Sequence, residues 1–353
     1  MKSSKKKIIE NIILSKGNIH FTLYVRPEYG LSHMKKQIVT AIMETNDELK
    51  DILTKEELRD FLKPIWRMYA DENMLKKFKL PIGIFRNKEE FHILSIPVKH
   101  DSDFSLADSF FVKPLLKWMQ FDHEYILIGI NNRSASLMYG DLTEAHIVDE
   151  IFYDENSMLK NESSFIEEIS FWINEWKQTM GASHKSSLII LGAESWVEKL
   201  SKRHEKKKGG VRLLRMNFEK EHRSLYIDEI RKIFAHEATL NLKSKIREFH
   251  FHTNNEEIIT DIFEIAEAVS SGRVRKIMIN EDFKIYGKYN TKEGTLNIHN
   301  RDMDYEDDDL LDDIAQEVIK QKGEVIVVSK NANDISAPIK AIVKKDFDAI
   351  KQI

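Results

Sequence analysis

Hydrophobic and polar positions follow two periods along the chain, and the switching between them predicts a mixed α/β protein. Residues 18–25 (NIHFTLYV) alternate and are rich in β-formers, which predicts a strand, whereas residues 32–78 follow a helical period. Within that stretch Asp47 and Thr54 are candidate helix caps, and Thr54 precedes Glu57 at the spacing of a capping box. The other expected strands are residues 81–85, 91–96, 125–130, 135–139, 145–151, 187–191, 276–279, 283–289, 295–299, 324–329 and 339–343; the other expected helices are residues 8–14, 106–119, 165–176, 194–202, one or two within 221–249, 258–270 and 310–322.

Polar stretches between these elements suggest three domains. The segment 154–164 is polar and suits a linker, and a total of 353 residues exceeds what one core usually supports. We therefore expect an N-terminal α/β domain over residues 1–154, a central α/β domain over 155–253 and a C-terminal α/β domain over 254–353. No internal repeat is visible in the chain.

Composition restricts the class of protein. Apolar residues make up 42% of the chain and charged residues 32%, and the formal net charge is −4. Such a chain can bury packed cores but attracts nucleic acid only through a local patch. The absence of cysteine excludes disulfides, zinc fingers, iron–sulfur clusters and thiol nucleophiles. Glu10 and Asn11 interrupt the first apolar run, which favours an amphipathic helix over a signal peptide, and no run is long enough to span a membrane. We expect a cytoplasmic protein.

The strongest local charge is basic. Residues 199–232 contain 12 Lys and Arg against 5 Asp and Glu. Several phosphate contacts from such a segment would give strongly salt-dependent binding, although a solvated surface loop is the plain alternative. The candidate RNA-binding residues are Lys202, Arg203, Lys206, Lys207, Lys208, Gly209, Gly210, Arg212 and Arg215. The two glycines lack the rest of a phosphate-binding loop motif, so a flexible turn is the preferred interpretation.

The remaining charged features favour neither a metal site nor catalysis. Residues 302–313 contain eight carboxylates, but the sixth and twelfth positions of an EF-hand counted from Asp302 fall on Asp307 and Asp313 instead of glycine and glutamate. We expect an exposed acidic loop whose charge favours the N-terminus of the next helix. His236 and Glu237 lack the second histidine of a zincin motif, and no nucleophile elbow or dinucleotide fingerprint occurs. The sequence predicts no metal, no cofactor and no enzymatic activity.

Several segments resemble one family in collinear order. Residues 111–117 (FVKPLLK) and the stretch YILIGINNRSASLMYGDL from Tyr125 resemble the bacterial archaeo-eukaryotic release-factor-like family, in its Balon-like branch of the release factor and Pelota superfamily. The segments FTLYVRPEYG and GIFRNKEEFHILSIPV resemble its opening strand and hairpin. IAEAVSSGRVRKIMI, DLLDDIA, GEVIVV and APIKAI continue the pattern in the C-terminal third, so the resemblance covers residues 18–345.

The resemblance implies a central RNase-H-like domain, a C-terminal domain like a kink-turn-binding ribosomal protein, and the ribosome with its RNA as partner. It also implies a translational GTPase as a further partner. Release factors carry Gly-Gly-Gln on a central-domain loop, whereas here Gly209-Gly210 is followed by Val211 and no Gly-Gly-Gln occurs. We therefore expect a ribosome-associated factor that acts in hibernation, stress response or rescue by binding, without hydrolysis of peptidyl-tRNA.

Two other classes stay open. One is a hydrolase of RNA or peptidyl-tRNA that positions water with another group, and turnover on charged tRNA would identify it. The other is a protein-interaction scaffold that has left the ribosome, whose partners would persist after RNase treatment.

Overall fold

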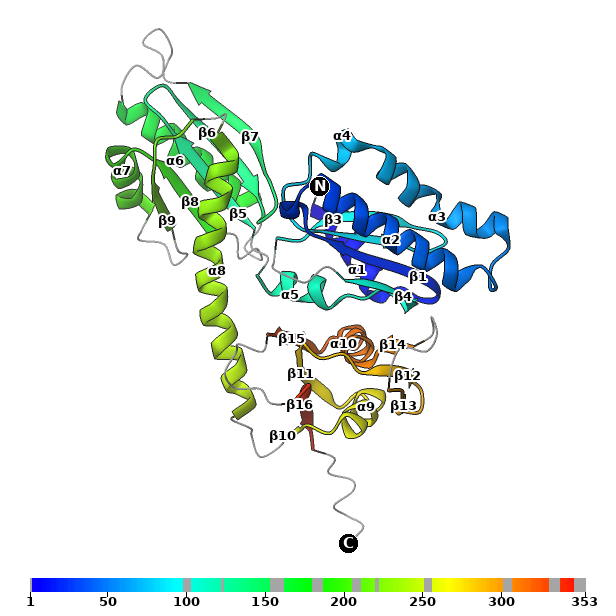
Figure 1. Ribbon diagram of the computed structural model, residues 1–353. Helices are drawn as coiled ribbons and strands as arrows, with labels where there is room; N and C mark the ends of the chain where they lie inside the picture. The colour runs from blue at the N-terminus through cyan, green and yellow to red at the C-terminus, as the bar shows by residue number, and fades with distance from the viewer. Residues whose placement is uncertain are drawn as a thin grey trace. The chain divides into compact units, whose positions relative to one another are not determined.

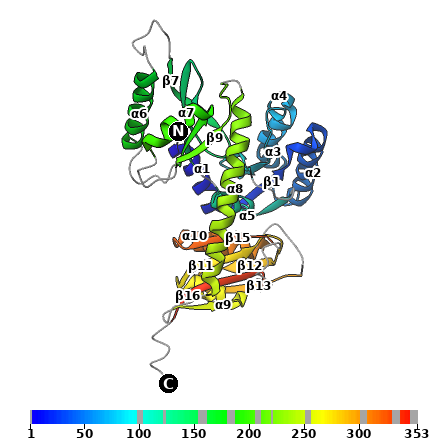
Figure 2. The same cartoon turned by 90° about the vertical axis from the view of Figure 1, so that its left-hand side faces the viewer.

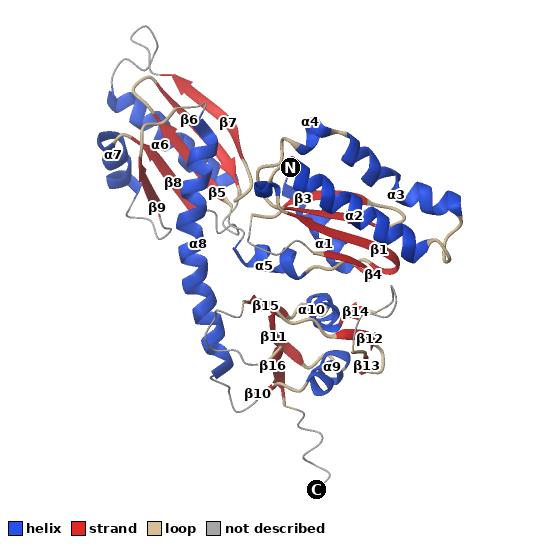
Figure 3. Ribbon diagram, viewed as in Figure 1, coloured by secondary structure: helices blue, strands red, loops and turns tan. Residues whose placement is uncertain are grey.

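The computed structural model describes residues 2–97, 103–121, 124–152, 162–179, 187–204, 211–219, 222–250, 256–300, 307–329 and 337–345. The chain divides into two compact units: unit 1 joins residues 1–120 to residues 239–353, and unit 2 comprises residues 121–238. Both mix helices with sheets, which confirms the predicted α/β class (Figures 1 and 3).

Unit 2 is built on one five-stranded sheet. Its elements are β5 (Tyr125–Ile130), β6 (Ser134–Gly140), β7 (Ala145–Phe152), α6 (Glu162–Thr179), β8 (Ser187–Gly192), α7 (Glu194–His204), β9 (Val211–Arg215) and α8 (Arg223–Arg247), whose residues from Thr239 onward belong to unit 1. The strand order is β7-β6-β5-β8-β9, with β5, β6 and β7 antiparallel and β5, β8 and β9 parallel, the arrangement of an RNase-H-like sheet. Helices α6 and α7 pack on one face of this sheet and the first half of α8 on the other.

The sheet crosses the domain boundary expected at residue 154. Strands β5, β6 and β7 precede that residue, yet β5 pairs directly with β8 from Tyr125↔Ser187 to Ile130↔Gly192. Strand β9 was also missed, because it directly follows a basic segment that reads as a loop. The polar stretch after residue 152 is therefore a connection within the unit that the sheet defines.

The N-terminal part of unit 1 contains a four-stranded antiparallel sheet, β3-β2-β1-β4. Its elements are α1 (Lys2–Leu14), β1 (Lys16–Val25), the 3-10 helix η1 (Pro27–Tyr29), α2 (Leu31–Leu49), α3 (Lys55–Ala70), α4 (Glu72–Leu75), β2 (Ile82–Arg86), β3 (Phe91–Ser95), β4 (Phe104–Ser109) and α5 (Lys113–Phe121). Helices α2 and α3 bury their apolar stripes on one face of the sheet, and α1 and α5 join the core on the other.

Two expectations for this part are wrong and one is confirmed. The predicted helix 106–119 starts only at Lys113, because Leu106 and Ala107 pair with β1 in strand β4, and Pro114 favours a helix start there. Asp47 lies inside α2 and caps nothing. Thr54 does form the predicted capping box: its Oγ accepts from the amide of Glu57 at 3.3 Å, and the Glu57 carboxylate accepts from the amide of Thr54 at 3.0 Å.

The C-terminal part of unit 1 carries the four-stranded sheet β10-β16-β11-β15 and the small sheet β13-β12-β14. Its elements are the 3-10 helix η3 (Glu248–His250), β10 (Glu256–Ile259), α9 (Ile262–Ser270), β11 (Val274–Asn280), β12 (Tyr286–Asn290), β13 (Thr295–Ile298), β14 (Asp308–Asp309), α10 (Leu310–Lys320), β15 (Glu324–Val328) and β16 (Ile339–Lys344). Helices α9 and α10 cover one face of the larger sheet and the end of α8 the other (Figure 2). The predicted helix 258–270 begins at Ile262, capped by Asp261, because Ile258 and Ile259 pair with β16.

The two parts of unit 1 share a hydrophobic core and a buried group of polar contacts. Residues of α1 and α5, such as Ile12 and Trp118, belong to the same core cluster as Ile314 of α10. At the start of α5, the amides of Val112 and Lys113 donate to the carboxylate of Asp312 at 2.8 and 2.7 Å. This carboxylate therefore satisfies two amides at the helix N-terminus from about 200 residues away in sequence, a task usually done by a neighbouring cap.

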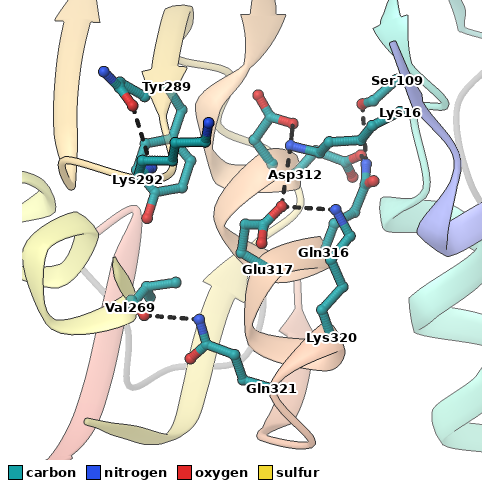
Figure 4. Close-up of polar contacts among 12 residues, drawn as sticks. Lys16, Ser109, Val269, Tyr289, Lys292, Asp312, Gln316, Glu317, Lys320 and Gln321 are labelled. Carbon is teal, nitrogen blue, oxygen red and sulfur yellow. Dashed lines mark hydrogen bonds and ion pairs between the residues drawn. The ribbon is translucent and has the colours of Figure 1, made fainter. Parts of the chain in front are cut away.

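Further side chains complete this contact. The ammonium of Lys113 donates to the carboxylate of Asp309 and, at 2.7 Å, to the carbonyl of Phe283. Gln316, fully buried, donates to Ser109 and to Asp312 (Figure 4). It also donates to the carbonyl of Phe110. Two sequence segments that resemble the same family, around Lys113 and around Asp312, are thus the two sides of one contact.

The prediction of an exposed acidic loop is wrong for the described end of residues 302–313. Asp307, Asp309, Asp312 and Asp313 are each less than 9% exposed, while the residues before Asp307 lie outside the described part of the chain. The buried carboxylates are tolerated because cations and amides meet them: Lys16 reaches Asp313 at 2.9 Å and Glu317 at 3.4 Å. The expected effect at the helix start is confirmed, since Asp309 caps α10.

Two general findings concern the described residues only. None of their helices is both long enough and apolar enough to cross a membrane. Nor do their histidine and carboxylate side chains come together in threes or more at a place where a metal ion could be held.

Candidate nucleic-acid interface

The predicted basic segment is only partly described. Lys202 lies exposed near the end of α7, and Arg203 follows it in the same helix. Lys206, Lys207, Lys208, Gly209 and Gly210 lie outside the described residues. The described positions that remain, Arg212 and Arg215, stand in strand β9.

Arg212 is engaged within the protein. Its Nε donates to Glu237 at 2.8 Å, a second guanidinium nitrogen contacts the other carboxylate oxygen, and the guanidinium carbon lies 4.9 Å from the ring centroid of Phe234. The side chain is 23% exposed. A bidentate pair backed by an aromatic ring fixes a guanidinium well, so Arg212 joins β9 to α8 and is not a free phosphate ligand.

Arg215 is separated from Arg212. Three residues of a strand span roughly 10 Å and turn the side chain to the other face of the sheet. Arg215 ends β9, is exposed, and pairs with Glu194 at 3.3 Å. Arg212 and Arg215 therefore do not gather at one place, and the RNA-binding role of the predicted set stays a prediction.

A different basic surface lies on helix α3. Lys55, Arg59, Lys63 and Arg67 recur every four residues, so they run along one side of the helix at steps of about 6 Å. All four are exposed, as is Trp66 at 43%. Arg59, Lys63, Trp66, Arg67 and Ala70 line a shallow depression, which we call the α3 depression.

The electrostatics of the α3 depression are one-sided. Its five lining residues supply three cations and no carboxylate. Arg59 meets Glu56 at 3.9 Å with both side chains more than 70% exposed, a pair worth little in water. Lys63 and Arg67 form no ion pair with any described residue. The acidic residues of α3 stand in its first two turns, so the second half of the helix is basic.

The local fold explains why this helix is firm despite an internal proline. Pro64 cannot donate to the carbonyl of Asp60, and such a break normally weakens a helix. The guanidinium of Arg86, from strand β2, donates instead to the carbonyls of Phe61 at 3.0 Å and Asp60 at 3.5 Å. The α3 depression therefore lies on a helix that is capped at its start and supported where its own hydrogen bonding fails.

One contact has the residue types of a nucleophile and its base. The hydroxyl of Ser15 lies 2.7 Å from Nε2 of His20. His20 is 1% exposed, its ring meets Phe110 edge-on at 4.4 Å, and Asn87 also donates to Ser15. A buried imidazole in this setting holds the start of β1 and offers no access to a substrate.

Comparison with known proteins finds likeness only among solved structures. No family model matches the chain, and no curated protein matches it. Archaeoglobus fulgidus Pelota is 12% identical, with a TM-score of 0.39, covering 75% of this chain and 84% of that chain. Archaeal translation termination factor aRF1 is 12% identical, with a TM-score of 0.25, covering 98% of each chain. S. cerevisiae Dom34 is 10% identical, with a TM-score of 0.36, covering 77% of this chain and 75% of that chain.

The structural neighbours thus include Pelota, Dom34 and an archaeal release factor. At such scores and identities the likeness settles no residue's role, and function has to be derived from the chain itself. The signal for the α3 depression was present in the sequence, as Lys-x3-Arg-x3-Lys-x3-Arg from Lys55 to Arg67. It was missed because Glu56, Glu57 and Asp60 nearly cancel those charges in any count over the segment.

Proposed function

We propose that the protein is a ribosome-associated factor of the release-factor type that acts by binding RNA and does not hydrolyse peptidyl-tRNA. The observation that carries the proposal is the α3 depression, where three exposed cations and an exposed indole meet on one supported helix. Cations interleaved with an aromatic ring are typical of RNA-binding surfaces. The resemblance of residues 18–345 to release-factor-like proteins names the ribosome as the RNA-containing partner.

The absence of hydrolysis is part of the proposal. No Gly-Gly-Gln occurs in the chain, and the histidine that contacts Ser15 is buried. Binding without cleavage suits hibernation, stress response or rescue. Among the structural neighbours, archaeal Pelota is described as ribosome-bound with ABCE1, and Dom34 as interacting with Hbs1. We propose a translational GTPase as a second partner of this chain, as the family resemblance implies.

Co-sedimentation with 70S ribosomes over a salt series tests the proposal. The test variant changes Arg59, Lys63 and Arg67 to alanine, and a control variant changes the exposed Lys243 and Arg247 of α8 to alanine. We expect wild-type pelleting to weaken with salt. Each lost phosphate contact lowers the slope of log affinity against log salt by about 0.7–0.9, so the triple variant should lose roughly two units of slope.

The controls separate the alternatives. The Lys243 and Arg247 variant should pellet like wild type, and programmed ribosomes should release no peptide when the protein is added. Peptide release would replace the proposal with the hydrolase alternative. If the amount of protein that pellets with ribosomes changes neither with salt nor with the triple substitution, the α3 depression does not bind ribosomal RNA.

A further inference from the structure

We infer that the α3 depression takes an unstacked base of single-stranded RNA against the indole of Trp66, with the flanking phosphates on Arg59, Lys63 and Arg67. This inference rests on the RNA-binding function proposed above and specifies the kind of RNA. The first reason is the identity of the exposed group. Trp66 is a large apolar side chain, 43% exposed, beside a row of three cations. A base offers a flat π-face to such an indole, and every base offers one.

The indole is held in place by its neighbours. Its ring meets that of Tyr69 edge-on, at 5.5 Å and 90°. The ammonium of Lys35 lies 4.8 Å from the centroid of the Tyr69 ring and 2.8 Å from Glu72. A ring supported in this way loses little freedom when a ligand stacks on it, which lowers the entropic cost of binding.

The surroundings leave room beside the indole. Ala70 is one helical turn beyond Trp66 and has the smallest side chain of the lining set. Lys63 and Arg67 flank Trp66 in the sequence, and Arg59 lies one turn before Lys63. The base would therefore sit between a small residue and a row of cations spaced along the helix axis at about 6 Å.

Other occupants fit less well. A membrane would need the apolar stripe of α3, but Leu58, Phe61, Leu62, Ile65 and Met68 are all buried in the core. An RNA duplex keeps its bases stacked and would use only the cations. An acidic peptide would satisfy the charges and leave the indole uncovered.

Fluorescence anisotropy with the full chain tests the inference. The probes are a labelled 12-nucleotide single-stranded RNA and a blunt duplex that contains the same strand, with unlabelled polyglutamate as competitor. We expect Trp66→Ala to weaken binding of the single strand roughly 5- to 150-fold, as loss of one stacked base does, and Trp66→Phe to stay within about 3-fold of wild type. Duplex binding should change little in either variant.

The two Trp66 variants, together with a thermal unfolding curve for each, guard against a trivial loss of fold. Quenching of indole fluorescence by the single strand should be smaller in Trp66→Phe than in wild type. Equal loss of duplex and single-strand binding in Trp66→Ala, or displacement of the single strand by polyglutamate, would overturn the inference. If alanine substitution of Arg59, Lys63 and Arg67 still weakens co-sedimentation with ribosomes, the proposed function stands even though this inference fails. Failure of every RNA probe and of ribosome pelleting would remove both.

Discussion

The carboxylate of Asp312 should make unit 1 less stable as pH rises. Burial, and then the nearby charge of Asp309, raise the pKa of Asp312 from 3.8 to about 7, against the opposing effects of Lys113, of the Val112 amide and of Gln316. An acid whose pKa is higher in the folded chain than in the unfolded chain stabilises the fold while protonated. That stabilisation is complete below the unfolded pKa and is lost as pH rises through the folded pKa.

The substitution Asp312→Asn isolates this effect. Asparagine is neutral throughout, so its cost, about 1–3 kcal/mol for leaving one buried amide of Val112 or Lys113 without an acceptor, is independent of pH. From the two pKa values, wild type should lose about 2.5 kcal/mol through Asp312 between pH 5 and pH 8. The variant should lack that loss, so the gap between the two proteins should narrow or reverse at pH 8.

Native-state hydrogen exchange of the peptide that contains Val112 and Lys113 measures the effect locally. Opening free energies are compared at pH 5 and pH 8 for wild type, for Asp312→Asn and for a control, Asp51→Asn, at an exposed position. The control should reproduce the wild-type pH dependence. The change in opening free energy from pH 5 to pH 8 is compared between wild type and Asp312→Asn. If these two changes differ by less than about 0.5 kcal/mol, or differ with the opposite sign, this account of the buried carboxylate is refuted.

Two stability predictions concern other contacts. Glu237→Ala should lower the free energy of unfolding of unit 2 by about 1–2 kcal/mol in urea, since Arg212 is left half-buried without its acceptor. The control Glu194→Ala breaks the exposed pair with Arg215 and should cost at most about 0.5 kcal/mol. Equal costs would show that the Arg212 pair stabilises the fold no more than an exposed pair does. Thr54→Ala should lower the free energy of unfolding by about 1 kcal/mol because it removes the capping box of α3. The control Thr40→Ala, on the exposed side of α2, should not destabilise the protein. An unchanged unfolding curve for Thr54→Ala would contradict the capping role.

The sequence predicted those elements whose formation depends only on residues close to one another in the chain. The capping box at Thr54 needs only residues three apart, and the buried strands β5 and β8 show as short apolar runs between turns. Strand β4 was misread because its pairing with β1 depends on residues more than 80 positions earlier, which no window over residues 106–119 contains.

Burial of charge was the part that the sequence could not supply. The run of carboxylates before α10 reads as exposed, because nothing near it in sequence neutralises Asp309 or Asp312. The Lys113 ammonium and the Val112 amide, which donate to these carboxylates, lie about 200 residues earlier in the sequence. Conversely, Arg212 reads as a free cation until Glu237 and Phe234 come beside it. The α3 depression was predictable from the sequence, because its cations recur every four residues and Trp66 falls on the same face of the helix.

Because the two parts of unit 1 share one core, the N-terminal part cannot complete its folding until the C-terminal part has been synthesised. Residues 1–120 leave the ribosome before residues 239–353, yet part of the core that covers Ile12 and Trp118 is encoded after residue 238. At about 5–20 residues per second, that early segment waits roughly 6–24 s for its remaining core while unit 2 is being made. Unit 2 is continuous in sequence and can close on itself during this interval. The nascent N-terminal part meanwhile exposes apolar surface, so chaperone demand should concentrate on the chain's first third.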